Sequence, residues 1–85
     1  MEIIINKDFS MQYKLIAGGA VEGTTAMELV ENIRACSLFP EKDAKSFKEA
    51  TAKRCMLYSN HRVRAIADGD FIDDLVENGY LRRVR

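Results

Sequence analysis

The sequence predicts a single α+β domain, residues 1–85, in which a small antiparallel sheet packs against two or three helices. Three observations support this fold class: β-branched and alternating residues near the N-terminus, amphipathic helical patterns in the middle, and a helix, a glycine and a short strand at the end. A chain of this length buries roughly 60–65% of its unfolded surface, so we expect a thin core.

The N-terminal part of the chain predicts a β-hairpin. Residues 2–5 contain a β-branched run of three isoleucines, and residues 6–8, Asn-Lys-Asp, are typical of a turn. Apolar and polar residues then alternate over 11–15, as in a half-buried strand. Two strands alone are only marginally stable in water, so we expect a packed helix or a third strand, for which residues 81–84 are the candidate.

The first helix is predicted to begin at Thr25. A glycine-containing stretch, residues 18–23, precedes it and is predicted to be a flexible connection. Thr25 and Glu28 have the spacing of a capping box, in which each side chain bonds the backbone N–H of the other. Apolar residues at helical spacing predict one buried face, made of Ala26, Leu29, Val30, Ile33 and Cys36.

A second helix is predicted from Pro40 or Glu41 to Tyr58, with an earlier end near Cys55 as the alternative. Proline disfavours helical backbone in the residue before it and suits the first turn of the helix that follows. The predicted buried face comprises Ala44, Phe47, Thr51, Cys55 and Tyr58, and the predicted solvent face comprises Lys42, Lys45, Lys48, Glu49 and Lys53.

The C-terminal part predicts a turn, a short helix and a strand. Residues 59–61 are typical of a turn, and residues 62–67 fit either a strand or one helical turn. Asp68 or Asp70 is expected to cap the helix that follows, and Gly79 is expected to end it in the left-handed conformation. The predicted apolar face of this helix comprises Phe71, Ile72, Leu75 and Val76.

The composition is that of an ordinary globular chain, with 47% hydrophobic and 31% charged residues. The N-terminal run of isoleucines is too short for a signal peptide or a membrane span, so we expect a cytoplasmic protein without membrane contact. Cys36 and Cys55 are then expected to be buried thiols. We expect no cofactor.

Three patterns that would indicate a chemical site are incomplete. The glycine-rich run 18–25 is similar to a phosphate-binding loop, but Thr24 stands where the lysine belongs. The two cysteines and His61 lack the spacing of zinc ligands, and His61 is expected to be solvated or capping. The acidic run 68–74 places Ile72 where a calcium loop needs an oxygen ligand. The sequence therefore predicts neither a catalytic residue nor a metal site.

The net charge of zero is unevenly distributed along the chain. Residues 1–40 carry −2, residues 41–64 carry +4 and residues 65–85 carry −2. The basic block 42–64 can contact phosphates, and the alternative is a solvated helix face with local ion pairs. The acidic helix can contact a basic partner, and the alternative is that its acids interact with the dipole of their own helix. The candidate macromolecule-binding residues are Lys45, Lys48, Lys53, Arg54, Arg62, Arg64, Asp70, Asp73 and Asp74.

The run from Phe71 to Val84, Phe-Ile-Asp-Asp-Leu-Val-Glu-Asn-Gly-Tyr-Leu-Arg-Arg-Val, resembles the third helix and first wing strand of winged-helix regulators. The resemblance covers fewer than a fifth of the residues. It departs from the family pattern in its acidic helix, where Asp73 and Asp74 would repel phosphates, and in ending at Arg85 without a second wing strand. The resemblance implies a relative that binds protein, or one that uses its basic second helix.

We therefore expect a small non-enzymatic regulatory or accessory protein that acts by binding another macromolecule, with a protein partner as the leading hypothesis. Charge-zoned single domains suggest a phage or mobile-element protein that modulates host machinery. The alternative is a DNA- or RNA-binding regulator that uses the basic block 42–64 and has a divergent winged-helix-like C-terminal half. A monomer or a homodimer is expected, since an exposed edge strand can pair across a two-fold axis.

Overall fold

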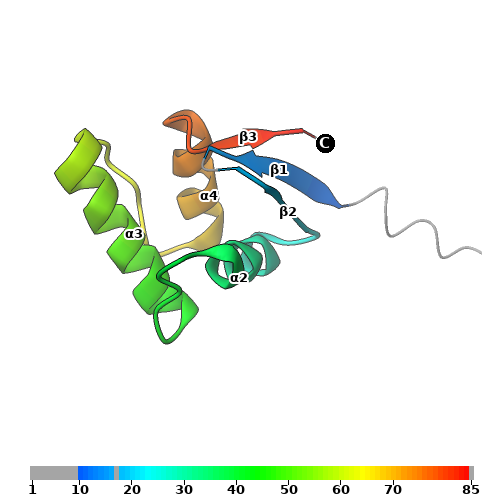
Figure 1. Ribbon diagram of the computed structural model, residues 1–85, viewed down its shortest axis with the longest axis horizontal. Helices are drawn as coiled ribbons and strands as arrows, with labels where there is room; N and C mark the ends of the chain where they lie inside the picture. Colours follow the sequence, from blue (N-terminus) through cyan, green and yellow to red (C-terminus); the bar gives the residue numbers. More distant parts are fainter. Residues whose placement is uncertain (1–9, 17, 85) are drawn as a thin grey trace, which may run out of the picture.

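The computed structural model describes residues 10–16 and 18–84 of the chain (Figure 1). Within them, three strands form an antiparallel sheet in the order β2-β1-β3, and of the three helices two pack against the sheet while the third packs against a helix. The elements are β1 (Met11–Leu15), β2 (Ala20–Gly23), α2 (Ala26–Cys36), α3 (Ala44–Ser59), α4 (Asp68–Glu77) and β3 (Leu81–Arg83). The predicted α+β class is confirmed, and the strand predicted at 2–5 lies outside the described residues.

The sheet contains a hairpin of β1 and β2, with β3 on the other edge of β1. Tyr13 pairs with Val21 across the hairpin, and the turn between the strands places Gly18 and Gly19 at positive φ angles of 106° and 86°. The flexible connection predicted for 18–23 is therefore wrong. Burial alternates along the four residues of β2, but Val21 is its one large apolar side chain, so the sequence shows no clear strand pattern there. The predicted third strand is confirmed in β3.

The core lies between the sheet and the helices, and its most buried large side chains are Leu29, Val30 and Phe71. Helices α2 and α4 contact each other, and each also contacts the sheet. Full burial of each such side chain contributes about 1.5–3 kcal/mol. Cys55 is buried as predicted, but Cys36 is exposed because it is the last residue of α2.

The first turn of α2 is capped by side chains on both sides of its start. Thr25 Oγ1 accepts the Glu28 N–H at 3.1 Å, as predicted. The Glu28 carboxylate instead reaches one residue further back, where it accepts the Thr24 N–H at 2.7 Å and the Thr24 hydroxyl at 3.0 Å. The backbone hydrogen bond from Thr24 lowers the pKa of Glu28 below its usual value. The capping residue was thus predicted correctly, and the returning bond is shifted by one residue.

Helix α3 begins after Asp43, later than the predicted start at 40 or 41. Asp43 Oδ1 accepts the Ser46 N–H at 2.8 Å, and this hydrogen bond lowers the pKa of Asp43. Glu41 has a φ of 60°, which no α-helix allows. A strong aspartate cap therefore sets the helix start in place of the proline.

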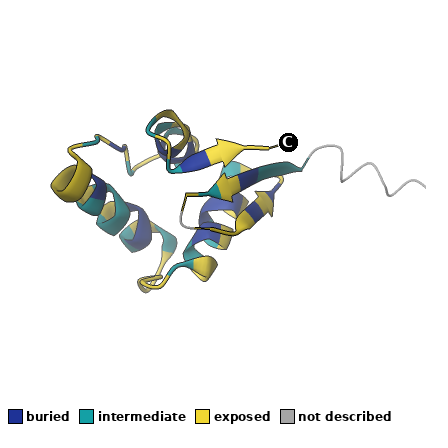
Figure 2. Cartoon of the chain, turned by 45° about the horizontal axis from the view of Figure 1, so that its top comes forward, coloured by how far each residue is buried: buried dark blue, intermediate teal, exposed yellow. Residues whose placement is uncertain are grey.

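The C-terminal end of α3 also differs from the expectation. The helix continues past Cys55 and ends at Asn60, whose φ of 56° is left-handed, so the alternative end near Cys55 is wrong. Tyr58, predicted to be buried, is 82% exposed, because this end of the helix extends beyond the core (Figure 2). Residues 62–67 form neither a strand nor a helical turn.

Helix α4 ends in a Schellman motif that turns the chain into β3. Gly79 has a φ of 84° and donates its N–H to the Val76 carbonyl at 3.1 Å. Tyr80 donates its N–H to the Leu75 carbonyl at 2.8 Å. The predicted glycine end is confirmed, and it positions Tyr80 between α4 and the sheet.

The start of α4 lacks the predicted aspartate cap. Ala67 occupies the capping position, and no side chain accepts a backbone N–H there. Asp68 binds Lys48 of α3 instead, and Asp70 lies within the helix. A tertiary ion pair therefore replaces the expected local cap.

Candidate binding groove

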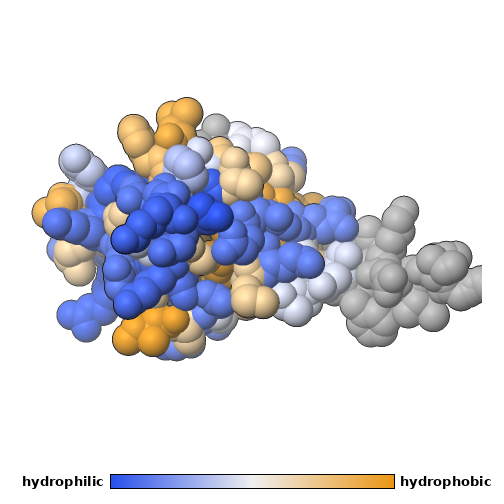
Figure 3. Space-filling model, turned by 90° about the horizontal axis from the view of Figure 1, so that it is seen from below, coloured by the Kyte–Doolittle hydropathy of each residue, from blue (hydrophilic) through white to orange (hydrophobic). Residues whose placement is uncertain are grey.

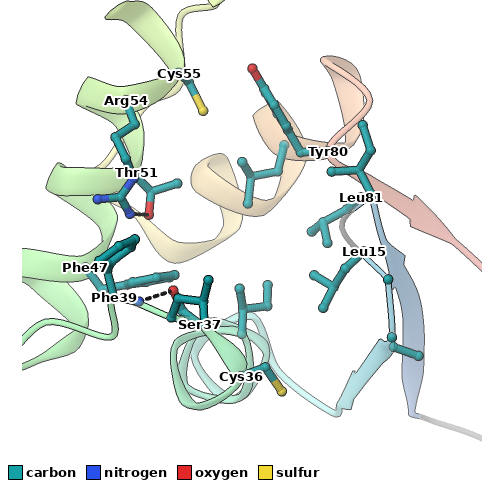
Figure 4. A pocket seen from close by; sticks show the side chains of 17 residues that line it. Leu15, Cys36, Ser37, Phe39, Phe47, Thr51, Arg54, Cys55, Tyr80 and Leu81 are labelled. Atoms are coloured by element: carbon teal, nitrogen blue, oxygen red, sulfur yellow. Dashed lines mark hydrogen bonds between the residues drawn. The ribbon is translucent and has the colours of Figure 1, made fainter. Parts of the chain in front are cut away.

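An apolar groove of about 570 Å³ lies between α3, the end of α2 and the β1–β2 hairpin (Figure 4). One wall is formed by Phe47, Thr51, Arg54 and Cys55 of α3, the opposite wall by Leu15, Tyr80 and Leu81, and Ile33 and Leu75 also line it. The Cys55 thiol points into the space between α3 and Tyr80. The groove therefore exposes part of the core that α3 does not close over.

Large apolar side chains stand exposed at the rim of this groove. Ile16 is 73% exposed, Leu38 is 90% exposed and Phe39 is 63% exposed, and all three line the groove. Soluble domains seldom gather such side chains in one exposed patch unless the patch has a partner. The rim and the groove together form the candidate site.

The loop that carries two of the rim residues is held by local hydrogen bonds. Ser37 donates its N–H to the Arg34 carbonyl at 3.1 Å and accepts the Phe39 N–H on its hydroxyl at 3.1 Å. Pro40 follows and disfavours helical backbone at Phe39. These constraints hold Leu38 and Phe39 outside the core.

Arg54 lies in the wall of the groove. Its guanidinium carbon is 5.8 Å from the centre of the Phe39 ring, a cation–π arrangement. Its Nη2 also donates to Thr51 Oγ1 at 3.4 Å. Arg54 was a candidate contact for phosphate, and the structure places it among apolar side chains.

Tyr80 is fixed at its end of the groove by His61. The Nδ1 atom of His61 lies 2.8 Å from the Tyr80 hydroxyl, and the two rings meet edge to face with centroids 5.6 Å apart. His61 is half-buried, so the expectation of a solvated or capping side chain is wrong. The pair braces the wall that faces α3.

Lys48, predicted to lie on the solvent face of α3, is 7% exposed. Its Nζ donates to Asp68 Oδ1 at 2.6 Å and to the Ile66 carbonyl at 3.0 Å. The aliphatic stem runs through the interior, and the ammonium group meets an anionic partner at its far end. Lys48 therefore ties α3 to α4, and its predicted place on the solvent face of α3 is wrong.

A second ion pair joins the basic block to the acidic helix. Arg64 Nε and Nη2 each lie 2.9 Å from an oxygen of Asp74, and the Arg64 backbone N–H donates to Asp74 at 2.8 Å. Arg64 is also 3.5 Å from Asp70. These hydrogen bonds lower the pKa of Asp74 to about 2 and raise the pKa of Arg64. The two charge zones, expected to meet partners separately, neutralise each other here.

The remaining charged candidates lie away from the groove. Lys45, Lys53 and Arg62 are exposed, and none forms a salt bridge with a residue that the structure describes. Asp73 is exposed and, with Glu77, lines a separate hollow of about 420 Å³. The candidate residues therefore do not converge on one site.

The groove brings together residues that sequence analysis did not select. Ile16, Leu38 and Phe39 come from two connecting segments far apart along the chain. One signal was available: Leu38 and Phe39 stand next to each other before a proline, where the chain leaves a helix and polar residues are expected. Adjacent large apolar residues in such a connection indicate an exposed contact surface.

Large apolar side chains are also exposed away from the groove, among them Met27, Leu57, Tyr58 and Ile66. The face in Figure 3 is largely hydrophilic, with separate hydrophobic areas at its margins. Among the described residues, no three His, Cys, Asp or Glu side chains gather in a group that would hold a metal ion. The groove combines exposed apolar side chains with a hollow of about 570 Å³, and it is the feature on which we base a functional proposal.

Comparison with protein-family models, curated proteins and solved structures finds no match to this chain. The segment that resembles winged-helix regulators does form a helix, a glycine turn and a strand, with β3 paired to β1 near the other end of the chain. In the described part of the chain, none of the helices has the length and apolar character needed to cross a membrane.

Proposed function

We propose that this protein is a non-enzymatic binding module that holds another protein in the apolar groove. The observation that carries the proposal is the exposure of Ile16, Leu38 and Phe39 around the groove. Burying such side chains against a partner yields about 25 cal/mol for each Å² removed from water. Phe39 lies beside Arg54, and aromatic residues and arginine are enriched in the core of protein–protein interfaces.

The polar groups in the groove suit binding. The lining includes the hydroxyl groups of Ser37, Thr51 and Tyr80 and the guanidinium of Arg54, set among apolar side chains. A few polar groups within an apolar surface fix the orientation of a bound partner. We propose a regulatory or accessory role for such a module.

A nucleic-acid partner is the second candidate, and the observation in its favour is the exposure of Lys45, Lys53 and Arg62. Against it, Lys48 and Arg64 are held by carboxylates within the chain. Fewer available cations mean fewer counterions released and a weaker, less salt-dependent interaction with phosphates.

Photo-crosslinking at defined positions tests the proposed function. The cross-linker p-benzoylphenylalanine replaces Leu38 at the rim, and in a matched control it replaces Met27 on α2, which is 65% exposed and outside the groove lining. In extract of the source cells, we expect a discrete protein adduct from position 38 that disappears with Phe39→Asp, and none from position 27. Equal labelling from both positions, or no adduct from either, would contradict the proposal.

A further inference from the structure

Arg54 is a partly buried cation, held in place, that no carboxylate in the described part of the chain neutralises. Phe39 and Thr51 fix its guanidinium at the groove wall. Among the described residues that line the groove, Arg54 is the one with a charged side chain. A planar guanidinium in this position is suited to a carboxylate from outside, because it offers several donors in a fixed fork.

The backbone around the groove offers little to an incoming extended strand. Backbone N–H groups at its edges already donate within the chain; these are the N–H groups of Leu15, Ile16, Gly18, Ser37, Phe39 and Tyr80. Strand addition depends on free backbone groups at a sheet edge, whereas a helix satisfies its own backbone and binds through side chains. The geometry therefore favours a helical occupant.

The size of the groove agrees with insertion of side chains. A volume of about 570 Å³ accepts several apolar side chains from one face of a helix, while the helix backbone stays above the rim. Leu38 and Phe39 then cover the flanks of that helix. One amphipathic helix can therefore cover the apolar rim with its apolar face and pair an acidic side chain with Arg54.

We propose that the groove binds an amphipathic helix of a partner protein whose apolar face carries, at one edge, an aspartate or glutamate that pairs with Arg54. This inference rests on the proposed function and adds the chemistry of the partner. The helix supplies apolar anchors at i, i+3 or i+4, and i+7, and the acidic residue fixes the register of the helix along the groove.

The test uses a displayed library of 16-residue peptides with leucine at positions i, i+4 and i+7 and the other positions randomised. Selection against the wild-type protein, with depletion on Phe39→Asp, isolates peptides that bind the groove. We expect these peptides to be helical when bound and to carry Asp or Glu at one constant offset from the leucines.

Charge reversal then isolates the contact with Arg54. Arg54→Glu should weaken a selected peptide about tenfold or more, and changing the peptide's acid to lysine should restore most of the loss. Arg54→Gln, which keeps the groove surface without the charge, should weaken binding by a smaller factor. Lys53→Glu makes the same charge change on the neighbouring residue outside the groove and should alter affinity less than about twofold.

The outcomes separate the two proposals. Helical peptides that bind the groove without an acid preference, and respond equally to Arg54→Glu and Lys53→Glu, would overturn the carboxylate contact and leave the proposed function standing. Extended peptides would overturn the helical occupant. If the wild type sediments as a dimer and Phe39→Asp dissociates it, the groove binds a second copy of this chain and not a partner protein. If deleting residues 1–9 does not raise the affinity for a selected peptide, those residues do not compete with the peptide for the groove. No enrichment of peptides that depend on Phe39 would overturn both proposals.

Discussion

Arg64 and Asp74 form a two-point ion pair that joins the segment after α3 to the middle of α4, with both N–O distances at 2.9 Å. Asp74 is well enclosed, with its side chain 17% exposed, whereas the Arg64 side chain is 56% exposed. A second pair, between Lys48 and Asp68, joins α3 to the start of α4. The basic and acidic zones of the sequence thus serve in part to hold the helices together.

The first prediction concerns acid stability. The pKa of Asp74 is about 2 in the folded protein, below the value of about 3.9 in an unfolded chain. Its stabilising contribution is therefore present above about pH 4 and is lost as the pH falls toward 2. The difference in Tm between the wild type and Asp74→Asn should be clear at pH 6 and should shrink across this window.

A neighbouring substitution is the control for that prediction. Asp73 is exposed and forms no salt bridge with the described residues, so Asp73→Asn should change the Tm little at any pH. A difference between the wild type and Asp74→Asn that stays constant from pH 6 to pH 2 would show that the ionised carboxylate of Asp74 contributes nothing to stability.

The second prediction concerns the buried end of Lys48. Lys48→Ala leaves the Asp68 carboxylate and the Ile66 carbonyl without their ammonium donor and should lower the free energy of unfolding by about 1–3 kcal/mol. Lys45→Ala, on the exposed side of the same helix, should stay within about 0.5 kcal/mol of the wild type. Urea denaturation measures the free energy of unfolding of both variants. Equal losses in the two variants would argue that the pair of Lys48 and Asp68 does not stabilise the fold.

The third prediction compares two glycines of the C-terminal region. Gly79→Ala should destabilise by about 1 kcal/mol, because Gly79 has a positive φ at the end of α4. Gly69→Ala should be neutral or stabilising by up to about 1 kcal/mol, since Gly69 is helical and an added Cβ meets no atom within 4 Å. Thermal unfolding of both variants measures these effects. If Gly79→Ala leaves the Tm unchanged, Gly79 does not end α4 in a Schellman motif.

The fourth prediction concerns the start of α2. Thr25→Ala removes the acceptor of the Glu28 N–H and should cost about 1 kcal/mol. Thr25→Ser keeps a hydroxyl in the same place and should retain most of the stability. If both variants unfold at the same urea concentration, the hydroxyl does not cap the helix.

Local signals in the sequence predicted the helix ends that depend on neighbouring residues. The cap at Thr25 and the glycine turn at Gly79 involve contacts within five residues, so their patterns are visible in the sequence. The start of α3 was misplaced because proline and Asp43 are competing local signals and the aspartate hydrogen bond dominates. Strand β2 was missed because it is short, follows two glycines and ends in a third.

Contacts between distant residues were not predictable in the same way. Lys48 and Asp68 are 20 residues apart, and their pairing depends on how α3 is rotated about its axis relative to α4. Helical periodicity alone placed Lys48 on the solvent face, which was incorrect. The groove likewise exists only after Ile16 and Phe39 are brought to the same edge by the tertiary fold. The uneven charge of the sequence indicated the basic block as a binding surface. The apolar rim lies in segments that connect secondary-structure elements, and hydrophobic periodicity gives no signal there.

The most direct test of the central claim compares the groove with the lysine-rich surface in one binding experiment. Tagged wild type, Phe39→Asp and the triple variant Lys42→Ala, Lys45→Ala and Lys53→Ala are used to retain proteins from nuclease-treated extract of the source cells. We predict that the wild type and the triple variant retain the same protein and that Phe39→Asp loses it. Retention by Phe39→Asp with loss in the triple variant, or retention by the wild type that occurs only in a parallel extract without nuclease, would contradict the groove as the binding site.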